Sequence, residues 1–392
     1  MSLNAIVQFA VEPADQAVAL TPNDPEAHYT RGLELVNLKR LDEASNELRE
    51  ATRLRPYHYY EWLDLGVTLD RLGDQTGAET ALKQSIYLAP SFAQPRWQFG
   101  NLLFRQGRYQ EAFEQLRSAT HSNPKLFTGM LDLAWVAAEN RFDAFQSLVE
   151  PQTRGNHLEM ASFLATHGQA PDAAREVAVA GAPKNSYERL LLQQTISTLL
   201  AARQFSDAYT AWMVTHPTAS KAPGQVQNGN FMDPIVKDEV GFGWQLPPVP
   251  GVTVFIDPVG PDSHCRSLVL NYSGDPAHSA QPTFQLVLLE PHSRYSLALS
   301  ARTENLISGG PPVIQMLDVS GKTPIILAQS KPLSAGTSEW VDYRVDFSTK
   351  DDTSVGVISL QRIPCNESPC PIFGKLWLSR FTLAKNEAEY SR

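Results

Sequence analysis

Apolar residues in the first half of the chain recur every three or four positions, in short segments separated by polar turns. The segments follow one another from residue 4 to residue 215. This spacing predicts amphipathic α-helices. Because the helices come in pairs of similar length, we expect roughly five or six helical hairpins over residues 4–215.

Small residues in this half recur with a fixed step of 34 positions. Gly32, Gly66 and Gly100 form one such column. Four further columns keep the same step: Ala44, Ala78 and Ala112; Leu48, Leu82 and Leu116; Ala51, Ser85 and Ala119; Pro56, Pro90 and Pro124. Small residues allow two antiparallel helices to approach closely, and a proline ends the second helix. The pattern predicts stacked copies of one helical hairpin.

The 34-residue pattern resembles the tetratricopeptide repeat over residues 21–124. The resemblance implies a right-handed superhelix with a concave groove, lined by the second, fifth, ninth, twelfth and thirteenth residues of each repeat. In this chain the groove-facing candidates include Tyr29, Asn37, Tyr60, Asp70, Arg71, Trp97, Asn101 and Arg105.

Two interpretations of these groove positions stay open. Asn101 and Arg105, beside Trp97, have the chemistry to grip the carboxylate or backbone of a bound peptide. Alternatively, the same side chains form a solvated inner face or pack against a neighbouring helix. The full set of basic and Asn residues used by the chaperone-tail-binding members of the family is absent.

Helical spacing stops after Trp212, and a segment rich in Pro, Ser, Thr and Gly follows, so residues 216–226 are expected to be a linker. Nine short segments with strand-like alternation occupy the rest of the chain. We therefore predict an all-α superhelical repeat array over residues 1–215 and an all-β jelly-roll sandwich over residues 227–392.

The phrases NGNF, GFGW, SLVLNYSG and FGKLWLSRFTL occur in this order in the second half. Together they resemble the jelly-roll carbohydrate-binding modules of the family 4/9 type, over residues 228–383. That family usually places acidic residues that help hold Ca²⁺ where this chain has Met232 and Ser379, so we expect no cofactor and do not favour calcium.

Saccharide binding requires an aromatic plane and planar polar groups. The predicted strands offer these candidates: Tyr272, Gln285, Arg302, Gln315, Trp340 and Tyr343. The alternative is that Trp244, Trp340 and Trp377 pack the core or an edge, as single tryptophans in sandwiches usually do.

The chain has three cysteines, and two of them are five positions apart in CNESPC. Cys365 and Cys370 are therefore expected to form a local disulfide in an oxidising compartment, with two free thiols as the alternative. Cys265 is then left over, buried as a small hydrophobic residue. This pair favours the bacterial periplasm or cell envelope as the location, with the cytoplasm as the alternative.

A formal net charge of −9 argues against nucleic acid or an anionic membrane as a partner. No apolar run is long enough to span a bilayer, and the N-terminus does not have the features of a signal peptide. The sequence also lacks the common catalytic motifs. We expect a non-enzymatic adaptor that holds a protein or peptide in the helical groove and a glycan or second protein on the sandwich. The alternatives are a scaffold that binds no sugar, and a glycan-active enzyme that uses Asp318, Asp342 or Asp346.

Overall fold

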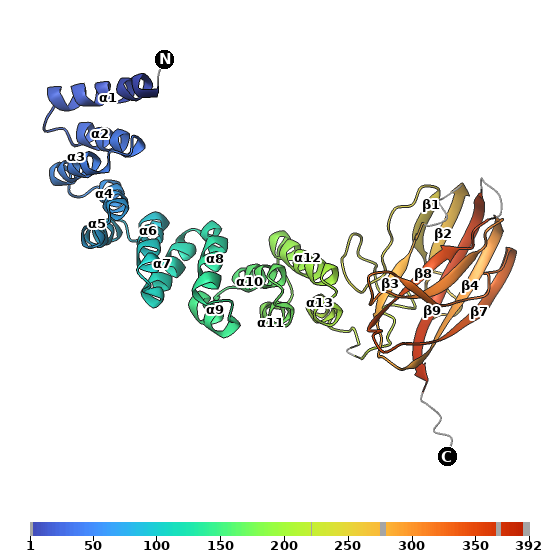
Figure 1. Ribbon diagram of the computed structural model, residues 1–392. Helices are drawn as coiled ribbons and strands as arrows, with labels where there is room; N and C mark the ends of the chain where they lie inside the picture. Colours follow the sequence, from blue (N-terminus) through green and yellow to red (C-terminus); the bar gives the residue numbers. More distant parts are fainter. Residues whose placement is uncertain (1–2, 221, 275–279, 366–369, 387–392) are drawn as a thin grey trace. The chain divides into compact units, whose positions relative to one another are not determined.

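The computed structural model describes residues 3–220, 222–274, 280–365 and 370–386, and of residues 3–11 only the backbone. The chain folds into two compact units, Met1–Gln152 and Thr153–Arg392. Figure 1 shows helices throughout the first unit, and helices followed by two β-sheets in the second.

The first unit is a row of antiparallel helical hairpins. Its helices are α1 (Leu3–Leu20), α2 (Pro25–Asn37), α3 (Leu41–Leu54), α4 (Tyr59–Leu72), α5 (Gln75–Leu88), α6 (Ala93–Arg105), α7 (Tyr109–Ser122), α8 (Phe127–Ala137) and α9 (Phe142–Val149). Asp24 and Asp74 start α2 and α5 by accepting backbone N–H bonds from the first turn. The helical hairpins predicted over this part of the chain are confirmed.

The glycine column marks the closest contact inside each hairpin. A Cβ at Gly32, Gly66 or Gly100 would lie 2.8, 2.7 or 2.7 Å from Cγ of the leucine sixteen positions later, namely Leu48, Leu82 or Leu116. These three leucines are fully or almost fully buried. The 34-residue period therefore records a packing requirement between the two helices of each hairpin.

The second unit begins with two more hairpins. They are formed by α10 (Arg154–Thr166), α11 (Ala170–Ala180), α12 (Ser186–Ala201) and α13 (Phe205–Trp212). Among the described residues, no helix combines the length and hydrophobicity that a membrane span requires.

The β part of the second unit is a sandwich of two antiparallel sheets, with strand orders β1-β2-β9-β4-β7 and β3-β8-β5-β6. The strands are β1 (Val252–Asp257), β2 (Ser267–Gly274), β3 (Phe284–Leu288), β4 (Arg294–Ser308), β5 (Pro312–Asp318), β6 (Ile325–Gln329), β7 (Gly336–Ser348), β8 (Val355–Arg362) and β9 (Ile372–Asn386). Each of the nine predicted segments overlaps one of these strands, and several strands, such as β4, β7 and β9, extend beyond the predicted segment. The inward side chains of both sheets, such as Leu297, Leu376 and Ile358, form one core.

Trp212 anchors the last helix to the segment that leads into the sandwich. Its ring stacks on His216 at 3.8 Å and meets Phe242 edge-on at 6.0 Å. Gly241 packs so closely on the indole that a Cβ there would lie 2.2 Å from it. The expected linker, residues 216–226, lies inside this unit, and the domain limits at residues 215 and 227 stay a prediction.

Candidate functional site

The groove-facing candidates lie on α2, α4 and α6, the first helix of each of three hairpins. The hydroxyl of Tyr29 on α2 donates to Oδ2 of Asp64 on α4 at 2.6 Å. The rings of Tyr29 and Tyr60 meet edge-on, with centroids 5.2 Å apart. The structure thus brings Tyr29 and Tyr60 together across two repeats.

The polar candidates further along the same helices already bond within the array. Arg105 on α6 forms an ion pair with Asp70 on α4. The side-chain amide of Asn101 donates to the backbone carbonyl of Trp97 at 2.8 Å. Asn101 and Arg105 thus each have a partner within the array, while the guanidinium of Arg105 stays half-exposed, so both interpretations of this surface stay open.

The remaining candidates keep more of their surface open. Asn37 and Arg71 are exposed at the ends of α2 and α4. Trp97 is half-buried, and its ring lies next to Gly129 of α8, where a Cβ would be 3.3 Å from it. Trp97 thus both packs on the next hairpin and presents part of an indole to solvent.

Sequence reasoning missed four charged groups beside the tyrosines. Arg55, in the turn before α4, donates to Glu61 at 2.6 Å and to Glu26 at 2.8 Å. Burial raises the pKa of Asp64 and of Glu61 above the ordinary carboxyl range. Burial, and then the bond to Asp64, raise the pKa of Tyr29. The group forms only when two repeats stack, because its members are 35 positions apart at the Tyr29–Asp64 bond.

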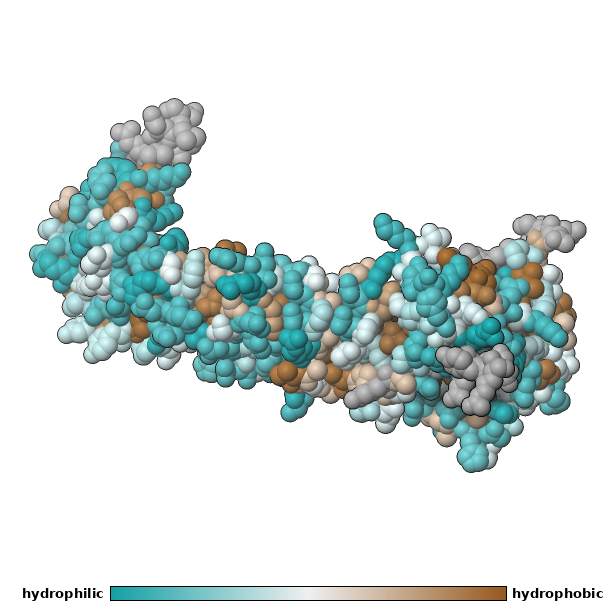
Figure 2. Space-filling model, turned by 60° about the horizontal axis from the view of Figure 1, so that its bottom comes forward, coloured by the Kyte–Doolittle hydropathy of each residue, from teal (hydrophilic) through white to brown (hydrophobic). Residues whose placement is uncertain are grey.

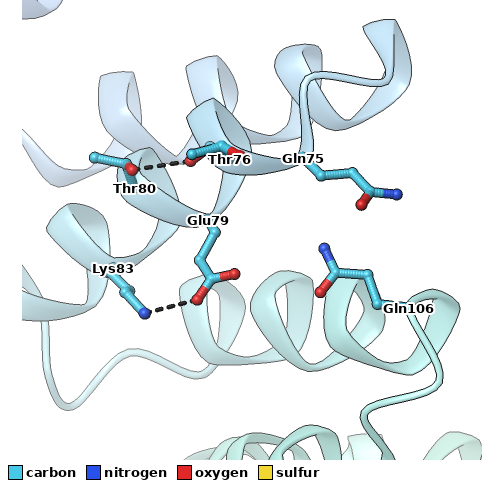
Figure 3. Close-up of a pocket in the computed structure, with 6 residues that line it drawn as sticks. All are labelled: Gln75, Thr76, Glu79, Thr80, Lys83 and Gln106. Atoms are coloured by element: carbon cyan, nitrogen blue, oxygen red, sulfur yellow. Dashed lines mark hydrogen bonds and ion pairs between the residues drawn. The ribbon is translucent and has the colours of Figure 1, made fainter.

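A polar hollow of about 500 Å³ lies between α5 and the end of α6 (Figure 3). Its lining residues are Gln75, Thr76, Glu79, Thr80, Lys83 and Gln106. Lys83 pairs with Glu79 at 2.7 Å, and Arg108 pairs with the same carboxylate at 2.9 Å. Arg108 also pairs with Glu111, so the two cations and the two carboxylates in and beside this hollow neutralise each other.

Two of the saccharide candidates on the sandwich are wrong, because they are buried. Tyr272 is 4% exposed and belongs to the core between the sheets. Gln285 is 0% exposed, and its amide bonds both the N–H and the carbonyl of Gln227 at 2.9 Å. Gln285 therefore ties the leading segment to β3, and neither side chain can meet a ligand.

The other saccharide candidates do not form one cluster. Gln315 lies on the four-stranded sheet and donates to Gln329 at 3.2 Å, whereas Arg302, Trp340 and Tyr343 lie on the five-stranded sheet. The hydroxyl of Tyr343 accepts from the backbone N–H of Ser334 at 3.0 Å, so the phenol is a packing group. The half-buried Trp340 lies on β7 where the pairing register with β4 shifts.

Arg302 covers a tryptophan instead of standing free. Its guanidinium lies 5.0 Å from the ring centroid of Trp377, which pairs with it across β4 and β9. The indole N–H donates to Asp257 at 3.0 Å, and that bond helps lower the pKa of Asp257, after a backbone bond from Val259. Trp377 is 6% exposed, in agreement with the packing alternative for this residue.

A polar groove with a cavity volume of about 690 Å³ lies on the outer face of the five-stranded sheet. Its polar lining residues include Asn228, Asn230, Asp342, Arg344, Arg380 and Thr382. Ser300 donates to Asp342, and Arg344 pairs with Asp346 at 2.9 Å. Residues from the leading segment and from β4, β7 and β9 meet here, so only the folded topology reveals the groove.

The acids proposed for catalysis do not form a glycosidase pair. Asp318 is buried on the other sheet, where it accepts from Thr353 at 2.6 Å. Asp342 and Asp346 are four residues apart on one strand, which separates them by about 13 Å. Glycosidase carboxylates lie about 5 to 10 Å apart.

Among the described residues, no three His, Cys, Asp or Glu side chains come together as a metal site. Ser379, at the position where the resemblance places an acidic residue, donates its hydroxyl to the carbonyl of Arg266. Ser379 and Met232 therefore do not fit a calcium site.

Cys365 and Cys370 are joined as a disulfide, with Cα atoms 5.9 Å apart. Cys265 is free and buried, and burial raises the pKa of its thiol. Residues 366–369 of the expected CNESPC loop lie outside the described residues. A buried thiol with a raised pKa is a poor nucleophile.

Comparison with known proteins identifies tetratricopeptide repeats in the helical half. The sequence model of the tetratricopeptide repeat matches residues 25–58 and 62–92. A TPR repeat-containing protein of Pseudomonas aeruginosa, PA4299, is 38% identical over 99 residues, which are 25% of this chain and 40% of that protein. This chain thus spans less than half of that relative.

Solved structures resemble both halves only loosely. MamA is 15% identical with a TM-score of 0.34, over 38% of this chain and 92% of MamA. YrrB, described as a TPR protein with an unusual peptide-binding site, is 23% identical with a TM-score of 0.32, over 37% of this chain and 77% of YrrB. A structure described as "CBM4 structure and function" is 13% identical with a TM-score of 0.31, over 41% of this chain and 99% of that protein. The chain carries tetratricopeptide repeats in its N-terminal half, followed by a β-sandwich.

Proposed function

We propose that this protein is a non-enzymatic adaptor whose helical repeats bind a protein or peptide partner. The observation that carries the proposal is the arrangement of α2, α4 and α6. Their small residues pack the hairpins, while Tyr29, Tyr60 and Asp64 meet from two successive repeats and the half-buried Trp97 lies on α6 of the third. Aromatic and charged side chains presented on a rigid repeat array are typical of peptide recognition.

The sandwich is proposed to bind a glycan through the groove that contains Asp342, Arg344 and Arg380. Carboxylate, guanidinium and amide groups match sugar hydroxyls, and the resemblance to carbohydrate-binding modules supports this choice. A protein with both modules would suit polysaccharide assembly or export at a bacterial envelope. The competing proposal is a sandwich that binds no sugar and serves only protein contacts.

A glycan array separates these two proposals. The full chain is compared with the Asp342→Ala and Arg344→Ala variants, and with Lys322→Ala, an exposed position between β5 and β6 of the other sheet, as the control. The adaptor proposal expects a set of retained glycans whose signal falls in the two groove variants and persists in the control. If the array retains no glycan, or if all three variants keep the signal, the groove is not a saccharide site.

The helical proposal has its own test. A Trp97→Ala variant should lose capture of the native partner while its melting temperature stays close to that of the wild type, because the indole is only half-buried. A large loss of stability with capture intact would make Trp97 a packing residue.

A further inference from the structure

Five side chains of α2 and α4 form what we call the acidic aromatic patch: Glu26, Tyr29, Tyr60, Glu61 and Asp64. The Tyr29–Tyr60 ring contact and the Tyr29–Asp64 bond connect the two helices. Arg55 joins the rest, since it pairs with Glu26 and Glu61 and lies 5.7 Å from the Tyr60 ring centroid. The patch is thus continuous across two repeats.

The charges of the patch do not balance. The patch has three carboxylates, and Arg55, the guanidinium beside it, bonds only Glu26 and Glu61. Asp64 accepts only the Tyr29 hydroxyl, and no cation of the described part of the chain forms an ion pair with it. Oε2 of Glu61 is buried and has no hydrogen-bond partner among the same residues. A negative charge therefore remains unmet at Asp64, and burial raises the pKa of that carboxyl.

The cations near the groove do not offset this charge. Arg105 pairs with Asp70, and Arg71, exposed at the end of α4, forms no ion pair with Asp64 in the part of the chain that the structure describes. A partner segment with an acidic end would meet the carboxylates of the patch and find no unpaired guanidinium at Arg105. A partner segment with a basic side chain would supply the charge that Asp64 lacks.

We propose that the acidic aromatic patch binds a lysine or arginine side chain in an extended segment of the partner protein. The ammonium or guanidinium group pairs with Asp64, and the aliphatic stem lies against the rings of Tyr29 and Tyr60. This inference rests on the proposed function, because it names the kind of partner that the helical groove takes.

The test is a selection from a random peptide library against the full-length protein, followed by affinity measurements on the enriched peptides. We expect enrichment in Lys and Arg. We also expect Asp64→Asn to lower the affinity for these peptides roughly tenfold, which corresponds to the loss of one charge-assisted hydrogen bond. Asp143→Asn, an exposed acid in the first turn of α9, is the matched control and should leave affinity unchanged.

A second variant separates binding from a merely structural role. Tyr29→Phe removes the hydroxyl that Asp64 accepts and leaves the carboxylate in place. Basic peptides should then bind at least as well as they do to the wild type. If Asp64 served only to hold Tyr29, the two variants would weaken binding equally.

The possible failures are distinguishable. Enriched peptides that are acidic or uncharged, or that bind Asp64→Asn as well as the wild type, overturn the basic-partner inference. If those peptides still lose affinity in Trp97→Ala, the groove function stands. A library from which no peptide is enriched overturns both proposals.

Discussion

His157 on α10 lies 2.6 Å from Glu176 on α11, and the same step of 19 residues joins His28 to Glu47 at 2.7 Å. The small residues keep the same spacing, because Ala161 and Ala173 stand where Gly32 and Ala44 stand in the earlier hairpin. All four are buried. The α10–α11 hairpin is therefore built on the same plan as the α2–α3 hairpin.

This equivalence predicts that the His157–Glu176 bond stabilises its hairpin. Glu176 is fully buried, so Glu176→Ala should lower the free energy of unfolding by about 1 to 3 kcal/mol, the cost of leaving a buried polar partner unsatisfied. Urea denaturation measures the change. Arg175→Ala, next in sequence but exposed, should stay within about 0.5 kcal/mol of the wild type. Equal effects of the two variants would remove the equivalence.

A second prediction concerns the glycine column. A Cβ at Gly66 would lie 2.7 Å from Cγ of Leu82, so Gly66→Ala should destabilise the array by about 1 to 3 kcal/mol. Gly155 lies in α10, where an added Cβ would have Oγ1 of Thr153 as its nearest neighbour, at 3.8 Å, so Gly155→Ala should be neutral or stabilising. The midpoints of denaturant unfolding of the two variants and the wild type measure these effects. A Gly66→Ala midpoint at or above that of the wild type would contradict the close packing of this hairpin.

The glycine column could be predicted from the sequence because each member meets a leucine at a fixed step in its own hairpin. The period is lost after Pro124, where α8 and α9 have 11 and 8 residues instead of the 13 and 14 of α2 and α3. This shorter hairpin shifts the later columns, so His157 falls out of register with His28. The candidate site was harder to predict. The alternation of apolar and polar residues placed Gln285 and Tyr272 on strands, but it did not show which face of the sheet each side chain occupies.

The raised pKa of Asp64 gives a third prediction, on pH and stability. Burial makes the folded protein bind a proton at Asp64 more readily than the unfolded chain does. The stability from this group is therefore present below the unfolded pKa and is lost as the pH rises through the folded pKa. Asp64→Asn should melt at a higher temperature than the wild type at neutral pH.

Melting curves between neutral pH and about pH 4 test this, since the difference between Asp64→Asn and wild type should shrink as Asp64 becomes protonated. The Asp143→Asn control should show no such convergence, because Asp143 is exposed. A wild type more stable than Asp64→Asn at neutral pH would show that the ionised carboxylate stabilises the array.

A fourth prediction concerns the cysteines. In unreduced native protein, Cys365 and Cys370 should resist alkylation because they are joined, and Cys265 should react only after unfolding because it is buried. Mass spectrometry of alkylated samples reads all three positions. The loop is short, so reduction should cost about 2 kcal/mol at most. Two reactive thiols at Cys365 and Cys370 before reduction would remove the bridge and the main sequence argument for an oxidising compartment.

Two positions on the surface of the helical array can be compared as sites of partner contact, Asn101 and Tyr87. Hydrophilic residues cover much of the helical surface visible in Figure 2, so a partner should be recognised by particular positions and not by a broad apolar face. Asn101 lies on α6, on the candidate groove side, whereas Tyr87 lies on α5 and is 78% exposed. Asn101 is partly exposed, so a side-chain probe at either position reaches solvent.

Site-specific photo-crosslinking in the native cell tests the adaptor account most directly. A photoreactive amino acid replaces Asn101 in one variant and Tyr87 in another, and both full-length proteins are irradiated under the same conditions. The account predicts a discrete crosslinked partner from position 101 that is absent from position 87. A crosslink of equal strength from both positions, or from position 87 alone, would contradict a partner held in the groove of the tetratricopeptide repeats.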